Sequence, residues 1–277
     1  MTLLPVLAYH AVGPPLDRRF APWTVSEGQL SEQLAALREA GYRLTSLTAA
    51  LQALDAGPSE VADVGQSHGD VAVTFDDGYA DFAEAALPVL LRHQSGATLF
   101  IVTDFVGQSA KWLPFPTERR RLLLSWSELE EVSTNDIEIG SHGCRHLELD
   151  AIHPEFARDE IERSRQAITD RLAPPACFAY PFGYHSALVR RMVAMAGYSA
   201  ACEVGRGLYR TSSDRMRVRR LLVQASDTPD ALLRRLAGPE QLPAARLREL
   251  ARPAWRAARR AKRSIRSLKL AQPLHES

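Results

Sequence analysis

The chain has 277 residues, of which 45% are hydrophobic and 24% charged, and its formal net charge is +1 at pH 7. This length suits a single domain with one large core, and an α/β barrel of roughly 250 residues would use most of it. Three cysteines are too few for a disulfide framework, and no apolar run reaches the roughly 18 residues of a membrane-spanning helix. The N-terminus lacks the basic leader and long apolar stretch of a signal peptide. We therefore expect a cytoplasmic protein without a transmembrane segment.

The first half of the chain alternates short apolar runs, which predict strands, with helical periodicity. A helix is expected from Ser26 to Ala40, because leucines recur on one face, Ser26 and Gln29 form a capping box and Gly41 supplies a stop. The other elements expected here are strands over residues 4–10, 43–47, 71–75 and 97–102, a helix over 82–92, and loops over 54–70 and 108–120. In the second loop, Trp112 and Phe115 fit either a sugar platform or loop packing.

The second half continues the alternation. Ser127 and Glu130 are expected to cap a helix, and Gly197 to end another. The elements expected are strands over residues 137–140 and 177–180 and helices over 154–172 and 186–196. About seven strands separated by helices, with few hairpin signals, predict a parallel sheet closed into a (β/α) barrel. We expect one barrel domain over residues 1–240 and a basic helical tail over 241–277.

Two adjacent carboxylates, Asp76 and Asp77, follow an apolar strand and precede Gly78. Consecutive residues leaving a strand point in different directions, so one acid can face a metal while the other faces a water. The carboxyl end of a strand is also where barrel enzymes place catalytic groups. Asp-Gly is common turn chemistry as well, so a simple turn is the alternative interpretation.

Two histidines four residues apart, His142 and His146, follow another strand. If the segment turns helically, they share a face and can chelate a metal. Two neutral imidazoles and one carboxylate form a three-ligand site with room for water, which is typical of catalytic zinc. A pair of surface histidines is the alternative. Cys144 lies between them, but we do not expect it to be a ligand.

The segments TFDDG (residues 74–78) and SHGCRH (141–146) together resemble the first two motifs of the polysaccharide deacetylase family, also called the NodB-homology domain or carbohydrate esterase family four. The resemblance covers roughly residues 1–225. It implies a distorted (β/α) barrel, an acetylated carbohydrate as substrate, a divalent metal held by Asp77, His142 and His146, and Asp76 as the general base. Zinc is the expected ion, and nickel, cobalt and manganese also suit these ligands.

The third family motif corresponds to residues 179–183, AYPFG. In the family the backbone N–H of the aromatic residue, here Phe182, helps to bind the developing oxyanion, and we place Tyr180 in the same substrate site. Ala179 stands where many members carry an arginine that orients the base. Arg220, on a later strand, is our candidate to supply that guanidinium.

The usual Leu-x-His motif near the C-terminus is absent, since no histidine lies between His185 and His275. His10 ends the first strand instead, which resembles the circularly permuted branch of biofilm poly-N-acetylglucosamine deacetylases. There the N-terminal histidine is the general acid. A packed core histidine is the alternative for His10, and His185 is a second candidate to line the cleft. An acid suits cleavage of an N-acetyl group more than an O-acetyl group, because an amine anion is the poorer leaving group. A carbohydrate-binding homologue without turnover is the competing function.

Ten Arg or Lys and one Glu between Arg246 and Lys269 give this stretch a formal charge of +9. Three interpretations are open. The stretch forms a solvated helix on the barrel, or a helix on an anionic inner-membrane surface, where each basic residue contributes about 1 kcal/mol. Nucleic-acid binding is the third interpretation and is not expected, because Trp255 is the one aromatic residue among the charges and no nucleic-acid module accompanies them.

Overall fold

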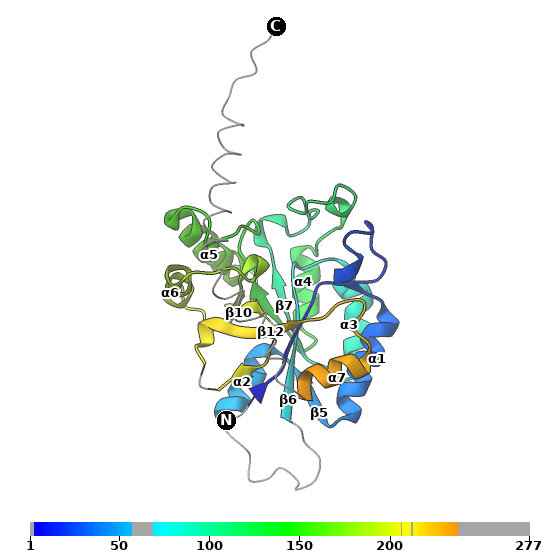
Figure 1. The fold of residues 1–277 in the computed structure, drawn as a ribbon. Coiled ribbons are helices and arrows are strands. Elements are labelled where there is room, and N and C mark those ends of the chain that lie inside the picture. The colour runs from blue at the N-terminus through cyan, green and yellow to red at the C-terminus, as the bar shows by residue number, and fades with distance from the viewer. Residues whose placement is uncertain (1–2, 57–68, 206, 212, 238–277) are drawn as a thin grey trace.

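The computed structural model describes residues 3–56, 69–205, 207–211 and 213–237, which form a ring of parallel strands surrounded by helices (Figure 1). β6 pairs with β2 and closes the ring, with Tyr9 opposite Phe75. The strands around the ring are β2 (Val6–Tyr9), β12 (Val218–Leu222), β10 (Ala200–Gly205), β9 (Cys177–Ala179), β8 (Ile137–Ser141), β7 (Ala97–Ile101) and β6 (Gly69–Phe75). The expected barrel of seven parallel strands is confirmed.

Short strands extend the ring at its edges. β5 (Tyr42–Thr45) pairs with the first half of β6, below the point where β7 joins that strand. β1 (Leu3–Leu4) pairs with β11 (Tyr209–Arg210), and β3 (Ala11–Val12) pairs with β4 (Thr24–Val25). Because β3 begins one residue after His10, its pairing with β4 fixes the segment in which β2 ends.

Helices cover the outside of the barrel (Figure 1), and α1 packs against α7 while α5 packs against α6. Their bounds are α1 (Glu27–Glu39), α2 (Leu47–Ala56), α3 (Leu87–Arg92) after one π-helical turn (Phe82–Ala86), α4 (Trp126–Ser133), α5 (Pro154–Thr169), α6 (Ala187–Met195) and α7 (Pro229–Ala237). No helix within the described ranges has the length and apolar character needed to cross a membrane. The expected domain boundary at residue 240 and the basic tail lie outside the described residues.

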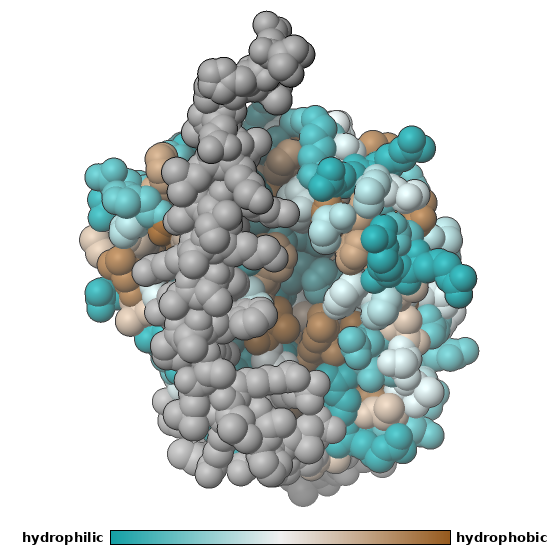
Figure 2. All heavy atoms as spheres, turned by 45° about the horizontal axis from the view of Figure 1, so that its top comes forward, coloured by the Kyte–Doolittle hydropathy of each residue, from teal (hydrophilic) through white to brown (hydrophobic). Residues whose placement is uncertain are grey.

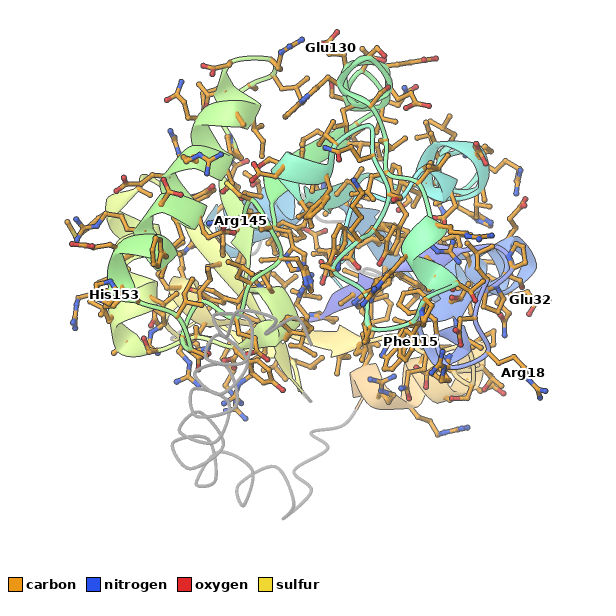
Figure 3. All side chains as sticks on the ribbon, turned by 90° about the horizontal axis from the view of Figure 1, so that it is seen from above. Arg18, Glu32, Phe115, Glu130, Arg145 and His153 are labelled. Carbon is orange, nitrogen blue, oxygen red and sulfur yellow. The ribbon has the colours of Figure 1, made fainter. Side chains whose placement is uncertain are left out.

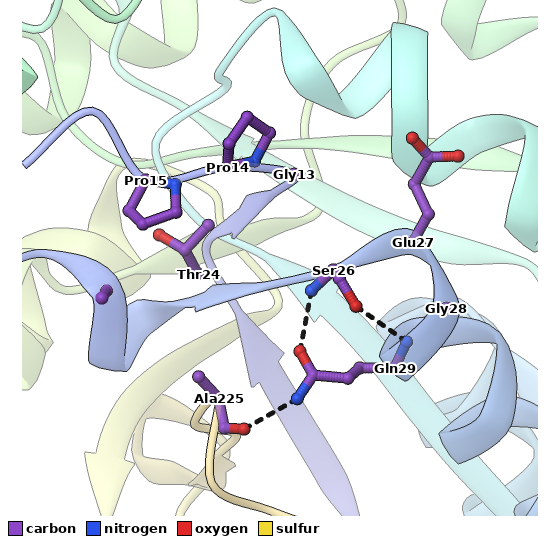
Figure 4. Close-up of a pocket in the computed structure, with 10 residues that line it drawn as sticks. Gly13, Pro14, Pro15, Thr24, Ser26, Glu27, Gly28, Gln29 and Ala225 are labelled. Atoms are coloured by element: carbon purple, nitrogen blue, oxygen red, sulfur yellow. Dashed lines mark hydrogen bonds between the residues drawn. The ribbon is translucent and has the colours of Figure 1, made fainter. Parts of the chain in front are cut away.

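The capping box expected at Ser26 is present. Its hydroxyl accepts from the Gln29 N–H at 3.1 Å, and the Gln29 side chain accepts from the Ser26 N–H at 2.9 Å. Gln29 also donates to the carbonyl of Ala225, which joins the start of α1 to the segment after β12 (Figure 4). Buried leucines then face the barrel along α1, which is the reason that this helix was predictable.

Two expectations about helices were wrong. Helix α4 starts at Trp126, capped by Ser125 and Glu128 rather than by Ser127 and Glu130. Both pairs have the spacing of a capping box, and the earlier pair places Leu129 and Val132 in the core. The second error is helix α2, whose last residues were assigned to a loop and whose first residue was assigned to a strand. Residues 57–68 of that loop lie outside the described residues, and residues 69–70 begin β6.

The barrel interior is packed below its rim. Phe100 points inward from β7, and a Cβ on Gly140 would lie 2.5 Å from its ring, so only glycine allows the phenyl group to fill this space. The Arg220 guanidinium lies over the same ring, 5.4 Å from its centroid. Small apolar side chains surround them, among them Val6, Ala72, Cys177, Ala179, Ala200, Cys202 and Val218. The fully buried Arg220 therefore packs on the filled interior of the barrel, beneath the rim.

Candidate functional site

The functional side chains lie where the inward-facing positions of three strands reach the rim. Side chains alternate along a strand, so the inward series through Ala8, Thr74 and Gly140 each continue two residues further to His10, Asp76 and His142. Parallel strands share one carboxyl end, and these three residues therefore meet there. The rim is hydrophilic at its outer edge, with hydrophobic residues nearer its middle (Figure 2).

Asp77, His142 and His146 form the one group in the described part of the chain whose ligand atoms could hold a metal, and these atoms lie within 4.8 Å of one another. The Asp77 Oδ1 atom is 3.7 Å from His142 Nε2 and 3.4 Å from His146 Nε2. That oxygen is buried and accepts no hydrogen bond within the described residues. A buried, unpartnered carboxylate oxygen facing two imidazoles fits a divalent cation.

The protonation of the two imidazoles suits ligation. His142 donates from Nδ1 to the carbonyl of Ala179 at 2.7 Å, which leaves the Nε2 lone pair facing Asp77. Burial lowers the pKa of His142 to about 4, although Asp76 opposes the shift. Burial likewise lowers the pKa of His146 to about 3. Both rings are therefore neutral at neutral pH and ready to bind a cation.

The backbone is strained at this site. Asp77, His146 and Phe182 have φ values of 77°, 55° and 59°, in the left-handed region that non-glycine residues rarely adopt. The spacing of His142 and His146 suggested a shared helical turn, but the structure has no helical turn between them. The segment between them is irregular and passes through Gly143 at φ 79°. The chelating geometry is thus a property of this loop and not of helical periodicity.

Asp76 is held by Arg220, which reaches it from β12. The Nη1 and Nη2 atoms donate to Oδ1 at 2.6 Å and Oδ2 at 2.7 Å, and Nη1 also donates to Thr74. Burial alone would raise the pKa of Asp76, but the Arg220 guanidinium and the nearby His142 hold it well below its usual range. The carboxylate is ionised, and the contact expected between these two residues is present.

His10 also lies next to Asp76. Its Nε2 atom is 4.0 Å from Asp76 Oδ2, and its side chain is 19% exposed, so it faces both the acid and the cleft. Its Nδ1 atom is buried and has no hydrogen-bond partner within the described ranges. His10 therefore lies beside Asp76 at the rim, outside the group formed by Asp77, His142 and His146.

Phe182 lies at the mouth of the site, in a turn that follows β9. Its ring is 49% exposed and packs edge-to-face on His146, with centroids 4.6 Å apart. The turn is fixed from beneath, because a Cβ on Gly183 would lie 2.5 Å from the Val204 nitrogen. Within the described residues, no acceptor takes the Phe182 N–H. This N–H is available to an anionic oxygen.

Tyr180 and His185, both considered as cleft residues, are buried elsewhere. The Tyr180 hydroxyl donates to the Met216 carbonyl at 3.1 Å, and its ring packs against His185. His185 Nε2 lies 2.6 Å from Glu203 Oε2. The Tyr180 side chain therefore supports the turn that carries Phe182 and cannot reach a substrate, which corrects the expectation for it. The periodicity of β9, with Phe178 and Tyr180 both outward, could have shown this.

Trp112 is a site residue for which the sequence left two interpretations open. Its ring stacks on His146, with centroids 5.3 Å apart and planes 25° from parallel. Phe115 instead packs against Phe20 and Trp23, and seen from above it lies on the side of the barrel that carries Arg18 and Glu32 (Figure 3). Trp112 thus covers His146, a candidate metal ligand, whereas Phe115 anchors the loop to neighbouring aromatic residues. The hollow at the start of α1 in Figure 4 contains none of the ligand residues.

Three comparisons relate the chain to known proteins. Residues 63–201, half of the chain, match the model of the family described as polysaccharide deacetylase. The protein YxkH of Bacillus subtilis is 26% identical over 198 residues, which is 70% of this chain and 62% of YxkH.

Solved structures show the same fold. The deacetylase PplD of Streptococcus pyogenes, solved with acetate, is 20% identical, with a TM-score of 0.71 over 84% of this chain and 97% of its own. A de-N-acetylase of Aggregatibacter actinomycetemcomitans is 19% identical, with a TM-score of 0.70 over 84% of this chain and 100% of its own. IcaB of Ammonifex degensii is 21% identical, with a TM-score of 0.68 over 85% and 97%. With the family model matching half of its length, the chain belongs to the polysaccharide deacetylase family.

Proposed function

We propose that this protein is a metal-dependent hydrolase that removes acetyl groups from an N-acetylated carbohydrate or glycoconjugate, with O-acetylated sugars as the less favoured substrates. The observation that carries the proposal is the convergence of Asp77, His142 and His146 beside an ion-paired Asp76. All four residues are buried at the carboxyl end of the barrel.

Asp77, His142 and His146 would hold the metal, with zinc expected and nickel, cobalt or manganese also suited to the set. When bound, such an ion acidifies a water molecule and polarises the substrate carbonyl. Ligands that are already neutral or anionic require no proton loss to bind it.

The protein's own residues would supply the proton transfers. Asp76 would accept the proton of the attacking water, with Arg220 orienting its carboxylate and keeping it ionised. His10 would donate a proton to the leaving nitrogen. The Phe182 N–H would donate a hydrogen bond to the oxyanion of the tetrahedral intermediate, an interaction whose loss typically costs about 2.7–4 kcal/mol.

The strand register supports a place in the circularly permuted branch. β12 pairs with β2 so that Leu222 lies opposite Ala8, and continuing this register places Gln224 opposite His10. The end of β12, where the family's later motif would carry a histidine, is therefore adjacent to the strand end that carries His10. A histidine in either position would face Asp76.

Release of acetate tests the proposal. Purified protein would be assayed on N-acetylated glucosamine oligomers, nucleotide sugars and lipid-linked sugars, with zinc, nickel, cobalt or manganese added. The Asp76→Asn variant is the matched control for contaminating activity. Binding of the sugars without acetate release by any metal form would instead favour the carbohydrate-binding homologue.

The basic stretch of residues 246–269 is proposed to bring the barrel to an anionic membrane surface, where a lipid-linked substrate would be found. Truncation after Pro243 should abolish binding to vesicles containing anionic lipid and leave turnover of a soluble substrate unchanged. Equal vesicle binding by both forms would contradict this part of the proposal. Added salt should weaken the binding of the full chain, because exposed charges are screened.

A further inference from the structure

Glu160 on α5 is a buried carboxylate with no part in the proton transfers proposed above. It is fully inaccessible to solvent, although it lies on a helix whose other acidic residues face outward. Its Oε2 atom accepts from the backbone N–H groups of Cys144 at 3.1 Å and Arg145 at 2.8 Å. Its Oε1 atom accepts from the Arg145 side-chain Nε. All three donors belong to the loop between His142 and His146.

The same loop is held from its opposite side. The carbonyls of Gly143 and Cys144 accept from the N–H groups of Thr103 at 3.1 Å and Asp104 at 3.0 Å. Each of these peptide groups is thus fixed between α5 and the segment after β7. Gly143 reaches this path at φ 79°, and a Cβ there would lie 3.5 Å from Glu160 Oε2. The hydrogen bonds define one route for the chain from the first histidine to the second.

Successive N–H groups beside a left-handed residue form a concave site that attracts an anion. Here the anion is the protein's own Glu160 carboxylate. Removing it would leave the N–H groups of Cys144 and Arg145 buried and unpartnered, and the loop would have to move to regain water or other acceptors. Movement would carry His146, which has a strained backbone and no hydrogen bond from its buried Nδ1 to other described residues.

We propose that Glu160 is a positioning residue that sets the geometry of the metal site by fixing the loop from His142 to His146. This inference rests on the metal site of the proposed function. It assigns the affinity of the site for the metal, and the shape of its coordination, to a carboxylate that touches neither metal nor substrate. Partners of this kind typically contribute 10–100-fold to metal affinity or activity.

Titration with Co²⁺, followed by its visible absorption, tests this role without relying on turnover. Glu160→Gln keeps the size of the side chain but replaces one acceptor oxygen with a donor. We expect a 10–100-fold weaker affinity for Co²⁺ and an altered absorption spectrum. Glu162→Gln, an exposed acid on the same helix, is the matched control and should leave both unchanged. Urea unfolding with chelator present separates a shifted loop from a lost fold.

A folded Glu160→Gln variant with the affinity and spectrum of the wild type would overturn the role of Glu160. If that variant does not fold, Arg145→Gln decides the matter, because it removes the contacts of the half-exposed Arg145 side chain with Glu160 and Asp159 and leaves both backbone bonds to Glu160. It should weaken Co²⁺ binding by less than tenfold, and unchanged binding would overturn the proposal. Failure of the wild-type protein to bind Co²⁺ would instead contradict the metal site itself.

Discussion

Both terminal nitrogens of Arg220 hydrogen-bond to the two carboxylate oxygens of Asp76, although the residues are 144 positions apart in the chain. The pair is fully buried between Thr74 and the ring of Phe100. A guanidinium in this position limits the rotation of the carboxylate while leaving Oδ2 within 4.0 Å of both His10 and His142. Asp76 therefore has a fixed orientation before any substrate arrives.

Arg220→Met should leave the buried Asp76 charge without its partner. Breaking a buried pair in this way typically costs about 3–5 kcal/mol, so we expect a corresponding fall in the free energy of unfolding, measured with urea. Turnover should fall as well, because Asp76, the proposed base, loses its orientation. The double variant Asp76→Leu/Arg220→Met should regain most of the stability and none of the activity. A single variant as stable as the wild type would show that the pair is not the source of either effect.

Asp76 and Asp77 are adjacent, but substitutions at the two positions should have different effects on metal binding. Asp76→Asn should retain the metal and lose turnover by about 10²–10⁴-fold, as expected for a general base. Asp77→Asn should lose metal and turnover together, because Asp77 faces both imidazoles. Metal content per chain and acetate release, measured on the same samples, check both outcomes. Retention of metal by Asp77→Asn and its loss from Asp76→Asn would exchange the two roles.

His10→Ala should reduce amide cleavage far more than cleavage of an activated aryl acetate. A phenolate leaves without a proton, whereas an amine requires one, and His10 is the imidazole that faces both the cleft and Asp76. Equal losses on the two substrates would mean that His10 only packs the rim.

The metal-free protein should lose stability as the pH falls from 7 to 5. The unfolded chain binds protons at His142 and His146 below about pH 6.5, whereas the folded chain holds both neutral down to about pH 4. The unfolded state therefore binds more protons in this window, which lowers the free energy of unfolding by roughly 1–2 kcal/mol for each imidazole. Urea unfolding with chelator at the two pH values measures the effect. The double variant His142→Gln/His146→Gln should show a much smaller dependence, and an equal dependence would contradict the assignment.

Sequence patterns predicted the parts of the molecule that depend on local periodicity. The strand ends at His10, Asp76 and His142 were correctly located, because inward alternation along a strand is visible in the sequence. The cap of α4 was misplaced because two capping boxes overlap, and only burial of Leu129 and Val132 distinguishes them. Local sequence signals indicate the type of an element, but packing decides which of two overlapping capping boxes marks its first residue.

The long-range contacts were harder to predict. The contact of Arg220 with Asp76 was inferred only from the absence of an arginine at Ala179. Glu160 was missed, although a glutamate on the apolar stripe of α5, between Ala157 and Ile161, is a signal that a sequence can show. Tyr180 was misplaced because a motif position says nothing about which face of the strand its side chain occupies.

The closure of the barrel between β2 and β6 has one more consequence. A closed ring of parallel strands has no first or last strand. The two chain ends could therefore be joined, and the chain opened between another pair of strands, without changing which strands are neighbours. β2 and β12 are far apart in the sequence, yet they pair side by side in the ring. What defines a catalytic position in such a molecule is its place around the ring, and the order in which the motifs are read along the chain is free to vary.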